Sequence, residues 1–380
     1  MLKKMKLRDL IDFKKGTYKW EEILKVPEFA KLKETEQNPK WHAEGSVWAH
    51  TVNVCNEALK ICDELNWISG GDRKKQILLG TALFHDIGKG ETTTFTDTWH
   101  SYNHESVGEK ITRRLLWDEE LSIREDVCAL VKYHMVLCLY RKSTHRAELL
   151  LDMSHKVHSL QMLLALCRCD LNGSVQEDLN RKSIDLMTVS EMEDFAKELN
   201  CYECPSLLPI TGKKSASDEK RLFFENKPKK FVHVLIGLPG SGKSTWIKEH
   251  VAYGTILSRD AIRAELGFCK EGEKIVGTSE QENAVSEEFN KALLEKMKTD
   301  NVECIYIDNI NLRRKYRNNF HTLLSDYNVV WKYFYFEADT IDKNINRRNG
   351  QIPSDKLLSM IETLDWPSPE EYDSLHIFLS

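Results

Sequence analysis

One decapeptide of the chain, TALFHDIGKG (Thr81–Gly90), sets a histidine and an aspartate side by side at the end of an apolar run. Imidazole and carboxylate groups suit Mn²⁺, Fe²⁺, Co²⁺, Ni²⁺ or Zn²⁺. Neighbouring residues on a helix diverge by about 100°. His85 and Asp86 can therefore hold one ion only where a helix turns into a loop, and we expect Gly88 to supply that break. The simpler alternative is a capped helix end with a satisfied histidine, so a metal site requires partners elsewhere.

Such partners occur in the same half of the chain, where nine of the thirteen histidines fall between residues 42 and 158. A single histidine in an apolar helical pattern is most often a buried structural residue. Here His50, His134 and Asp170 all lie in such patterns, and His104 follows the histidine–aspartate pair. We therefore predict a site for one or two divalent transition-metal ions, which would activate water and stabilise an in-line displacement. The candidate ligands are His50, His85, Asp86, His104, His134 and Asp170.

A nonapeptide in the other half, GLPGSGKST (Gly237–Thr245), fits the phosphate-binding pattern G-x-x-x-x-G-K-[ST] between an expected strand and an expected helix. Its glycines let backbone N–H groups face inward around the phosphates. Lys243 adds a charge toward the β- and γ-phosphates, and the Ser244 hydroxyl suits Mg²⁺. We predict that ATP with Mg²⁺ is the phosphate donor. The expected nucleotide contacts are Gly237, Pro239, Gly240, Ser241, Gly242, Lys243, Ser244 and Thr245.

Polar residues that follow the later expected strands are candidates to bind or activate a phosphoryl acceptor. Asp260 lies just past the second strand, where a carboxylate can accept the proton of an attacking hydroxyl or simply cap the next helix. Arg263, three residues on, shares its side of that helix and is expected to clamp an acceptor phosphate. The third strand ends at Asp308, which either orients water on Mg²⁺ or holds the phosphate loop. Further candidates are Asn311 on the acceptor and Arg347 and Arg348 over the transferring group.

The secondary structure expected around these residues divides the chain into two parts. Residues 1–212 carry apolar side chains at three- and four-residue spacing with few strand signals, which predicts an all-α domain. Residues 213–229 turn polar and charged and read as a linker. In residues 230–380, β-branched and aromatic runs alternate with helical stretches, which predicts an α/β domain with a parallel sheet built from βαβ units.

The bulk composition restricts the class of protein less than these motifs do. The chain has 380 residues, long enough for two cores, and a net charge of −5 that does not indicate a general nucleic-acid binder. No apolar run approaches the roughly 20 residues that span a bilayer, so we expect no membrane association. Ten scattered cysteines without an export signal favour reduced thiols and a cytoplasmic location.

Two resemblances follow from these residues. The set GLPGSGKST, SRDAIR, IDNINL and NRRNGQIP resembles the 5′-hydroxyl polynucleotide kinases, which implies Asp260 as general base, Arg263 on the phosphate 3′ of the acceptor, and a lid arginine at the transition state. Ile310 stands where that family often has threonine. The order H…HD…H…H…D over roughly residues 40–175 resembles the HD-domain metal-dependent phosphohydrolases, which implies that Lys89 faces a substrate phosphate.

Together the two halves resemble the bifunctional HD–polynucleotide kinase enzymes of bacterial RNA repair. That resemblance implies end healing of RNA, or alternatively of DNA. An NTP such as ATP phosphorylates a 5′-OH, and the HD domain removes a 2′,3′-cyclic phosphate, 2′-phosphate or 3′-phosphate. A separate RNA ligase would then seal the ends. Two alternatives stay open: a nucleotide-metabolism enzyme that joins an HD nucleotidase to a small-molecule kinase, and a regulatory ATP sensor.

Overall fold

The computed structural model describes residues 5–67, 72–157, 159–204, 229–269, 277–299, 303–338, 340–347 and 352–379. The chain forms two compact units, Met1–Lys213 and Lys214–Ser380. Residues 213–228 of the expected linker lie outside the described residues. None of the described helices is both long enough and apolar enough to span a membrane.

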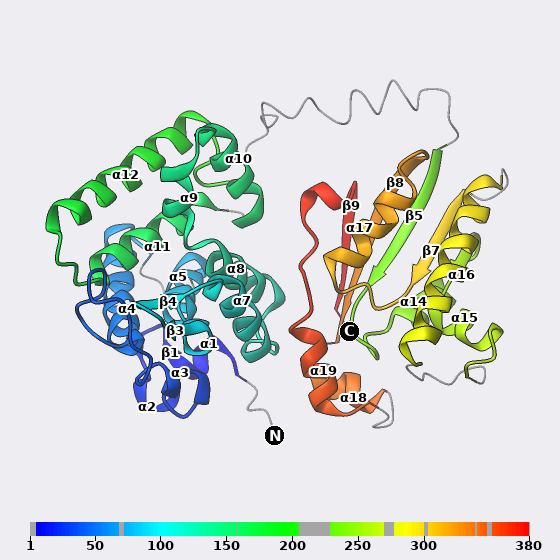
Figure 1. Ribbon diagram of the computed structural model, residues 1–380, viewed down its shortest axis with the longest axis horizontal. Coiled ribbons are helices and arrows are strands. Elements are labelled where there is room, and N and C mark those ends of the chain that lie inside the picture. The colour runs from blue at the N-terminus through cyan, green and yellow to red at the C-terminus, as the bar shows by residue number, and fades with distance from the viewer. Residues whose placement is uncertain are drawn as a thin grey trace. The chain divides into compact units, whose positions relative to one another are not determined.

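The first unit is built mainly of helices (Figure 1). They are α1 (Leu7–Leu10), α2 (Trp20–Ile23), α3 (Pro27–Lys31), α4 (Val47–Glu64), α5 (Arg73–Phe84), α6 (Lys89–Thr92), α7 (His104–Leu115), α8 (Leu121–Tyr133), α9 (Val136–Lys142), α10 (Arg146–Val157), α11 (Leu160–Gly173) and α12 (Leu179–Glu198). Two short antiparallel pairs, which the helical periodicity did not predict, interrupt them. They are β1 (Ile11–Asp12) with β2 (Thr17–Tyr18), and β3 (Thr93–Phe95) with β4 (Trp99–Ser101).

Helix α5 lies at the centre of this unit. Asp72 caps it by accepting from the backbone N–H groups of Lys74 and Lys75. From Ile77 to Phe84 every side chain is buried, which is why its apolar pattern covers all sides rather than one face. Helices α4, α8 and α11 pack on it.

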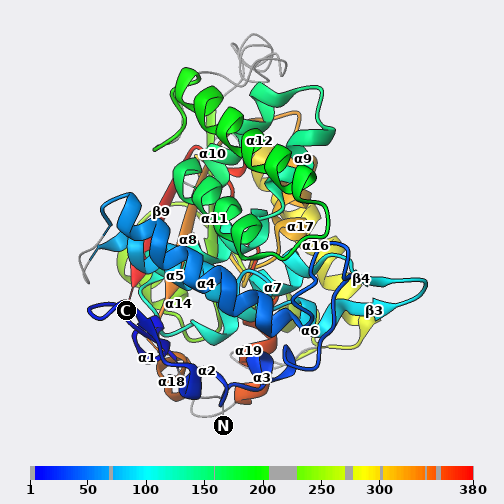
Figure 2. The same ribbon diagram turned by 90° about the vertical axis from the view of Figure 1, so that its left-hand side faces the viewer.

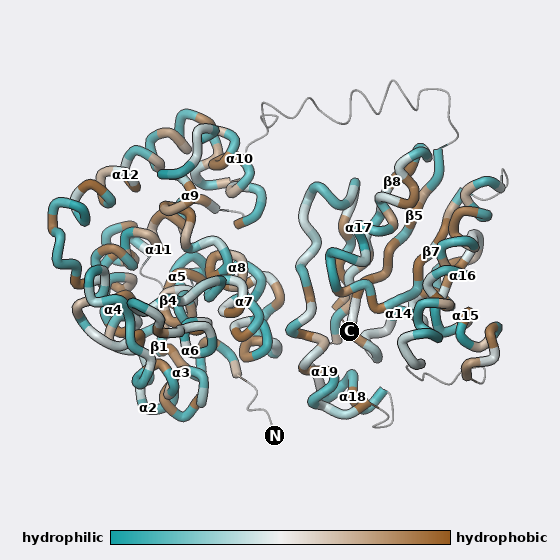
Figure 3. The backbone as a smooth tube through the Cα atoms, viewed as in Figure 1, coloured by the Kyte–Doolittle hydropathy of each residue, from teal (hydrophilic) through white to brown (hydrophobic). Residues whose placement is uncertain are grey.

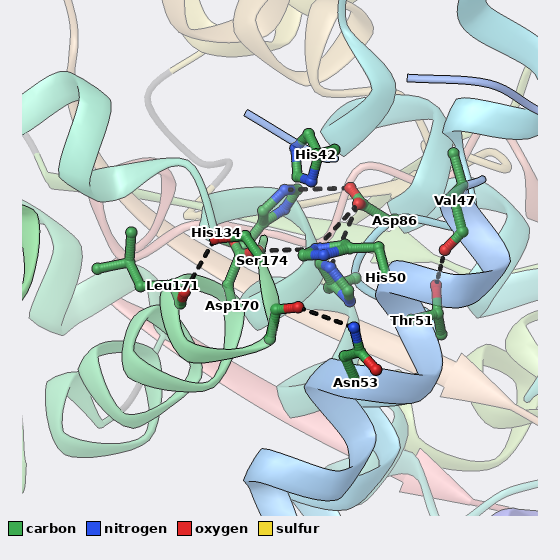
Figure 4. A network of polar contacts seen from close by, with 12 residues as sticks. His42, Val47, His50, Thr51, Asn53, Asp86, His134, Asp170, Leu171 and Ser174 are labelled. Atoms are coloured by element: carbon green, nitrogen blue, oxygen red, sulfur yellow. Dashed lines mark hydrogen bonds and ion pairs between the residues drawn. The ribbon is translucent and has the colours of Figure 1, made fainter. Parts of the chain in front are cut away.

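Helices α4 and α11 pack closely and bring two distant parts of the sequence together. A Cβ on Gly173 would lie 2.8 Å from the backbone nitrogen of Val54, so glycine is required for this approach. The Asn53 side-chain amide donates to the Gly173 carbonyl at 3.1 Å (Figure 4). This contact fixes the register that sets His50 of α4 beside Asp170 of α11.

The second unit is a five-stranded, fully parallel sheet with helices between the strands, which confirms the predicted α/β class. Its helices are α14 (Lys243–His250), α15 (Arg259–Glu265), α16 (Ser279–Lys298), α17 (Arg314–Leu323), α18 (Ile341–Asn346) and α19 (Ser354–Ile361), with a 3₁₀ turn at Pro369–Glu371. The strand order is β6 (Thr255–Leu257), β7 (Cys304–Asp308), β5 (Lys229–Ile236), β8 (Asn328–Glu337) and β9 (Ser374–Leu379).

The phosphate loop leaves the carboxyl end of the central strand β5, whose buried residues make a hydrophobic run in Figure 3. From β5 the chain crosses to β6 on one side of β5, and from β7 it crosses to β8 on the other side. Parallel α/β sheets bind ligands at the carboxyl edge where the connections change sides in this way. Gly240 and Gly242 have φ angles of +80° and +99°, a region that favours glycine. The loop conformation thus depends on its glycines.

Candidate functional site

The histidine–aspartate pair occupies a turn between two helices, as its spacing predicted. Helix α5 ends at Phe84, and α6 begins at Lys89. The role expected for Gly88 was wrong, because its backbone is right-handed, with φ −68° and ψ −21°. Glycine is needed there since a Cβ would overlap the His104 carbonyl oxygen and lie 2.6 Å from the Gly108 nitrogen. Gly88 therefore lets α7 pack directly against the turn.

Three buried histidines present the same ring nitrogen to one point. The Nδ1 atoms of His85, His104 and His134 lie 2.9, 2.7 and 2.7 Å from the carbonyl oxygens three residues earlier in each case. Each Nδ1 must therefore carry the proton, which leaves Nε2 as the lone-pair atom in the neutral ring. Backbone anchoring of this kind orients histidines that bind metals.

The Nε2 atoms surround the carboxylate of Asp86. Asp86 Oδ2 lies 3.3 Å from His85 Nε2, and Asp86 Oδ1 lies 3.4 and 3.8 Å from the Nε2 atoms of His104 and His134. The two latter Nε2 atoms are 3.1 Å apart, and His85 Nε2 is buried without a hydrogen-bond partner. Two facing lone pairs and an unpaired buried nitrogen are a donor set that a divalent cation fits.

His50 and Asp170 complete the set of six residues. His50 Nε2 lies 2.9 Å from Asp170 Oδ1 and 3.8 Å from Asp86 Oδ2, and all three converge in Figure 4. The ligand atoms of His50, His85 and Asp86 lie within 4.8 Å of one another. The structure thus brings all six predicted residues to one largely buried cluster, from helices α4, α7 and α11, from the turn after α5 and from His134 directly after α8.

Glu44 belongs to this cluster although the sequence analysis did not single it out. One of its oxygens lies 2.8 Å from His50 Nδ1 and 3.0 Å from His42 Nδ1, and the other accepts from the Val175 N–H at 2.8 Å. Glu44 therefore orients the His50 ring from behind. A glutamate in a loop ahead of a helix carries no local signal of such a role.

Electrostatics divides the imidazoles into two groups. Burial lowers the pKa of His134 to about 4, with the neighbouring His104 acting in the same direction, and burial also lowers the pKa of His104. Burial opposes the charged form of His50 as well, but its hydrogen bonds to Asp170 and Glu44 outweigh that and raise its pKa to about 9. The carboxyl pKa of Asp86 stays well below its usual range despite burial, because Lys89 and the histidines surround it. The neutral imidazoles of His104 and His134 thus lie beside the ionised carboxylate of Asp86.

A cleft of about 380 Å³ opens beside the cluster. Lys89 and His104 form part of its wall, and the Lys89 ammonium lies 2.7 Å from Asp86 Oδ2 and 2.9 Å from Gln37 Oε1. Lys89 was predicted to face a substrate phosphate; the structure places it between Asp86 and the cleft. A ligand in this cleft would lie within reach of the ammonium and of His104.

In the second unit the phosphate loop has the contacts of a nucleotide site. The Lys243 ammonium donates to the carbonyls of Gly237 and Leu238 at 2.7 and 3.0 Å. The Ser244 hydroxyl donates to Asp308 Oδ2 at 3.2 Å, which brings the two groups expected near Mg²⁺ together. Helix α18 closes on the loop, because the buried Asn344 amide donates to the Pro239 carbonyl at 3.0 Å. No motif in the sequence marks Asn344 for this contact.

The expected acceptor residues lie on α15. Arg263 Nη1 is 2.6 Å from Asp260 Oδ1, while its Nε and Nη2 bind the Glu282 carboxylate at 2.8 and 2.9 Å. Arg259 also binds Glu282 at 2.8 Å. Hydrogen bonds from Arg263, opposed by partial burial, lower the pKa of Glu282 to about 2. Glu282, on α16, is therefore the anchor that holds Arg263 against Asp260.

The remaining predicted residues differ in their surroundings. Asn311 is buried, and its amide donates to the Leu235 carbonyl at 2.8 Å, so its described contacts support the strands rather than an open site. Arg347 is exposed, and its Nη1 lies 3.3 Å from the Gly240 carbonyl of the phosphate loop. Arg348 lies outside the described residues.

Comparisons with known proteins agree with this division. A family model described as an HD domain matches residues 47–165, and one described as an AAA domain matches residues 232–367. The helical first unit thus contains a segment similar to HD domains, and the second unit, which carries the phosphate loop, contains a segment similar to AAA domains.

Among curated proteins, the multifunctional CCA protein of Pasteurella multocida (strain Pm70) is 28% identical over 158 residues, 39% of this chain. The match spans 35% of that protein's length. Among solved structures, a gluconokinase from Sinorhizobium meliloti 1021 is 21% identical with a TM-score of 0.28, covering 40% of this chain and 82% of that one. A sugar kinase from Janibacter sp. HTCC2649 is 18% identical with a TM-score of 0.27, covering 40% and 86%.

Proposed function

We propose that the protein is a nucleic-acid end-healing enzyme that acts on both sides of an RNA break. The second unit phosphorylates a 5′-OH with ATP or another NTP, and the first unit removes a 2′,3′-cyclic phosphate, a 2′-phosphate or a 3′-phosphate. The observation that carries this proposal is that one chain holds a His/Asp cluster that could bind a metal ion, beside a cleft, and a P-loop with an acid–arginine pair at the same sheet edge. A separate RNA ligase would consume the product.

In the HD unit the six cluster residues would hold one or two divalent ions. Such an ion, when bound, supplies Lewis acidity to the phosphoryl group and to water. The chain's own contribution is orientation: backbone carbonyls fix three imidazoles, and Glu44 fixes the fourth. The Lys89 ammonium at the cleft wall would pair with a phosphate oxygen and offset its negative charge.

In the kinase unit Lys243 and the loop amides would hold the NTP phosphates, with Mg²⁺ at Ser244 and Asp308. Asp260 would accept the proton of the 5′-hydroxyl as its oxygen attacks the γ-phosphorus and the bond to the β-phosphate oxygen breaks. Arg263 holds Asp260 in place and adds a positive charge beside it. That charge suits an acceptor that carries a phosphate near the reacting hydroxyl, which a nucleic-acid strand does and a simple sugar does not.

The experiment is to incubate the full chain with ATP, Mg²⁺ and Mn²⁺ and an RNA that ends in 5′-OH and 2′,3′-cyclic phosphate, then to map both ends. We expect a 5′-phosphate and a free 3′-end. The same RNA with a 5′-phosphate and a 3′-OH is the matched control and should not change. If only mononucleotides or small polyols were turned over, the chain would be a nucleotide-metabolism enzyme and the proposal would be wrong.

A further inference from the structure

The cleft beside the metal cluster is lined by aromatic rings that neither the cluster nor Lys89 requires. Trp41, Trp99 and Tyr102 form its walls together with imidazoles, and its volume of about 380 Å³ is in the range of sites for single small ligands. Tyr102 is 75% exposed, and Trp41 is 37% exposed. Large aromatic side chains that stay accessible beside a buried reaction centre are available to stack on a planar group of a ligand.

These rings come from two separate segments. Trp99 and Tyr102 lie in or next to β4, whose hairpin with β3 projects from the helical unit in Figure 2. Trp41 lies in the loop that precedes α4. The Tyr102 ring stacks on that of His100, with an interplanar angle of 8° and centroids 5.2 Å apart. A ligand in the cleft therefore meets aromatic surface from both segments.

The charge and polarity of the lining also define the ligand. Among the described residues that line the cleft there is no carboxylate, whereas Lys89 is cationic, and the Lys40 ammonium lies 4.9 Å from the Trp41 ring centroid. The Gln37 oxygen faces the Lys89 ammonium, so its amide nitrogen points elsewhere, and that buried nitrogen has no hydrogen-bond partner. The lining offers donors and cations for an anion and aromatic faces for a ring.

We propose that this cleft binds the last nucleotide of a single strand, with its phosphate at Lys89 and the metal cluster and its base stacked on the rings of Trp41 and Tyr102. The inference rests on the proposed phosphohydrolase function and adds one requirement to it: the terminal base of the substrate must be unpaired. A base at the blunt end of a duplex is already stacked and paired, so it can reach these rings only by leaving its partner.

The test uses the full chain and RNA strands that carry a 3′-phosphate and a 5′-fluorescein, which blocks the kinase end. Three substrates share the same labelled strand and present its 3′-terminal nucleotide differently: as a base in a single strand, as an abasic residue in a single strand, and as a paired base in a blunt duplex. One readout is kcat/KM for phosphate release. The other is binding by fluorescence anisotropy in EDTA, which requires no metal.

We expect the single strand with its terminal base to bind and react roughly tenfold or more better than the abasic strand and the blunt duplex. Trp41→Ala and Tyr102→Ala should reduce that ratio toward one, whereas Trp41→Phe should retain most of it. Tyr253→Ala, at an exposed aromatic residue of the other unit, is the control and should keep the full ratio.

The outcomes separate this inference from the function on which it rests. Equal binding and turnover of the base-bearing and abasic strands, or of the single strand and the blunt duplex, would overturn the stacking site while leaving the phosphohydrolase in place. If none of the three substrates released phosphate, the proposed function itself would be overturned. A wild-type ratio in both Trp41→Ala and Tyr102→Ala would show that the base is recognised elsewhere.

Discussion

Replacement of Glu44 by glutamine tests how the metal cluster is oriented. In the structure one carboxylate oxygen of Glu44 serves the Nδ1 atoms of His42 and His50, and the other accepts the Val175 N–H. All three partners are satisfied only by a group with two acceptor oxygens. Glutamine has one, so its NH₂ must face either a backbone N–H or the imidazoles. At least one contact is therefore lost, and the ring that offers Nε2 to the cluster loses its anchor.

Loss of such a supporting contact typically lowers metal affinity by about 10- to 100-fold. We expect that change for Mn²⁺ and Zn²⁺ in Glu44→Gln, measured by competition with a chromophoric chelator. Glu57→Gln is the control, because Glu57 lies on α4 and bonds Lys60 away from the cluster. Thermal unfolding of both variants should match wild type closely enough to exclude loss of the fold. Equal metal affinity in folded Glu44→Gln and wild type would show that Glu44 does not orient the cluster.

Three further predictions concern single contacts in the two units. Gly88→Ala should destabilise the helical unit by about 2 kcal/mol or more and weaken metal binding, because its Cβ would overlap the His104 carbonyl; Gly90→Ala, whose Cβ would meet only side chains, should be milder in denaturant unfolding. Arg263→Ala should raise KM for 3′-phosphorylated 5′-OH acceptors tenfold or more while ATP binding is retained, and an unchanged acceptor KM would argue against an oligonucleotide acceptor. Since the pKa of Glu282 is lowered to about 2 from 4.5, its ion pairs stabilise the fold above about pH 4.5 and are lost as the pH falls toward 2; the urea midpoint should decline over that window less in Glu282→Gln than in wild type.

The fold class and the six cluster residues were predictable because their signals are local. His85 and Asp86 adjoin a helix end, and the phosphate loop carries its own glycine pattern. His50, His134 and Asp170 lie in apolar helical patterns. The β3–β4 hairpin escaped prediction, since three-residue strands are too short to show a period.

The supporting residues could not be predicted, because their roles depend on contacts distant in sequence. Glu44 reaches Val175, 131 residues away, and Glu282 binds Arg263 from another helix. Asn344 touches the phosphate loop from 105 residues away. Gly88 was expected to break a helix by its conformational freedom, but the structure shows that the approach of α7 is what requires it. Packing partners of this kind become visible only in three dimensions.

On the proposed function, one chain carries two independent phosphoryl-handling sites that act on opposite ends of a break. The most direct measurement is end mapping of an RNA with 5′-OH and 2′,3′-cyclic phosphate after treatment with Asp86→Ala and with Lys243→Ala. We predict that Asp86→Ala adds the 5′-phosphate and leaves the cyclic phosphate, whereas Lys243→Ala heals the 3′-end and leaves the 5′-OH. Loss of both activities in either folded variant, or retention of both, would show that the chain does not carry two independent sites of this kind.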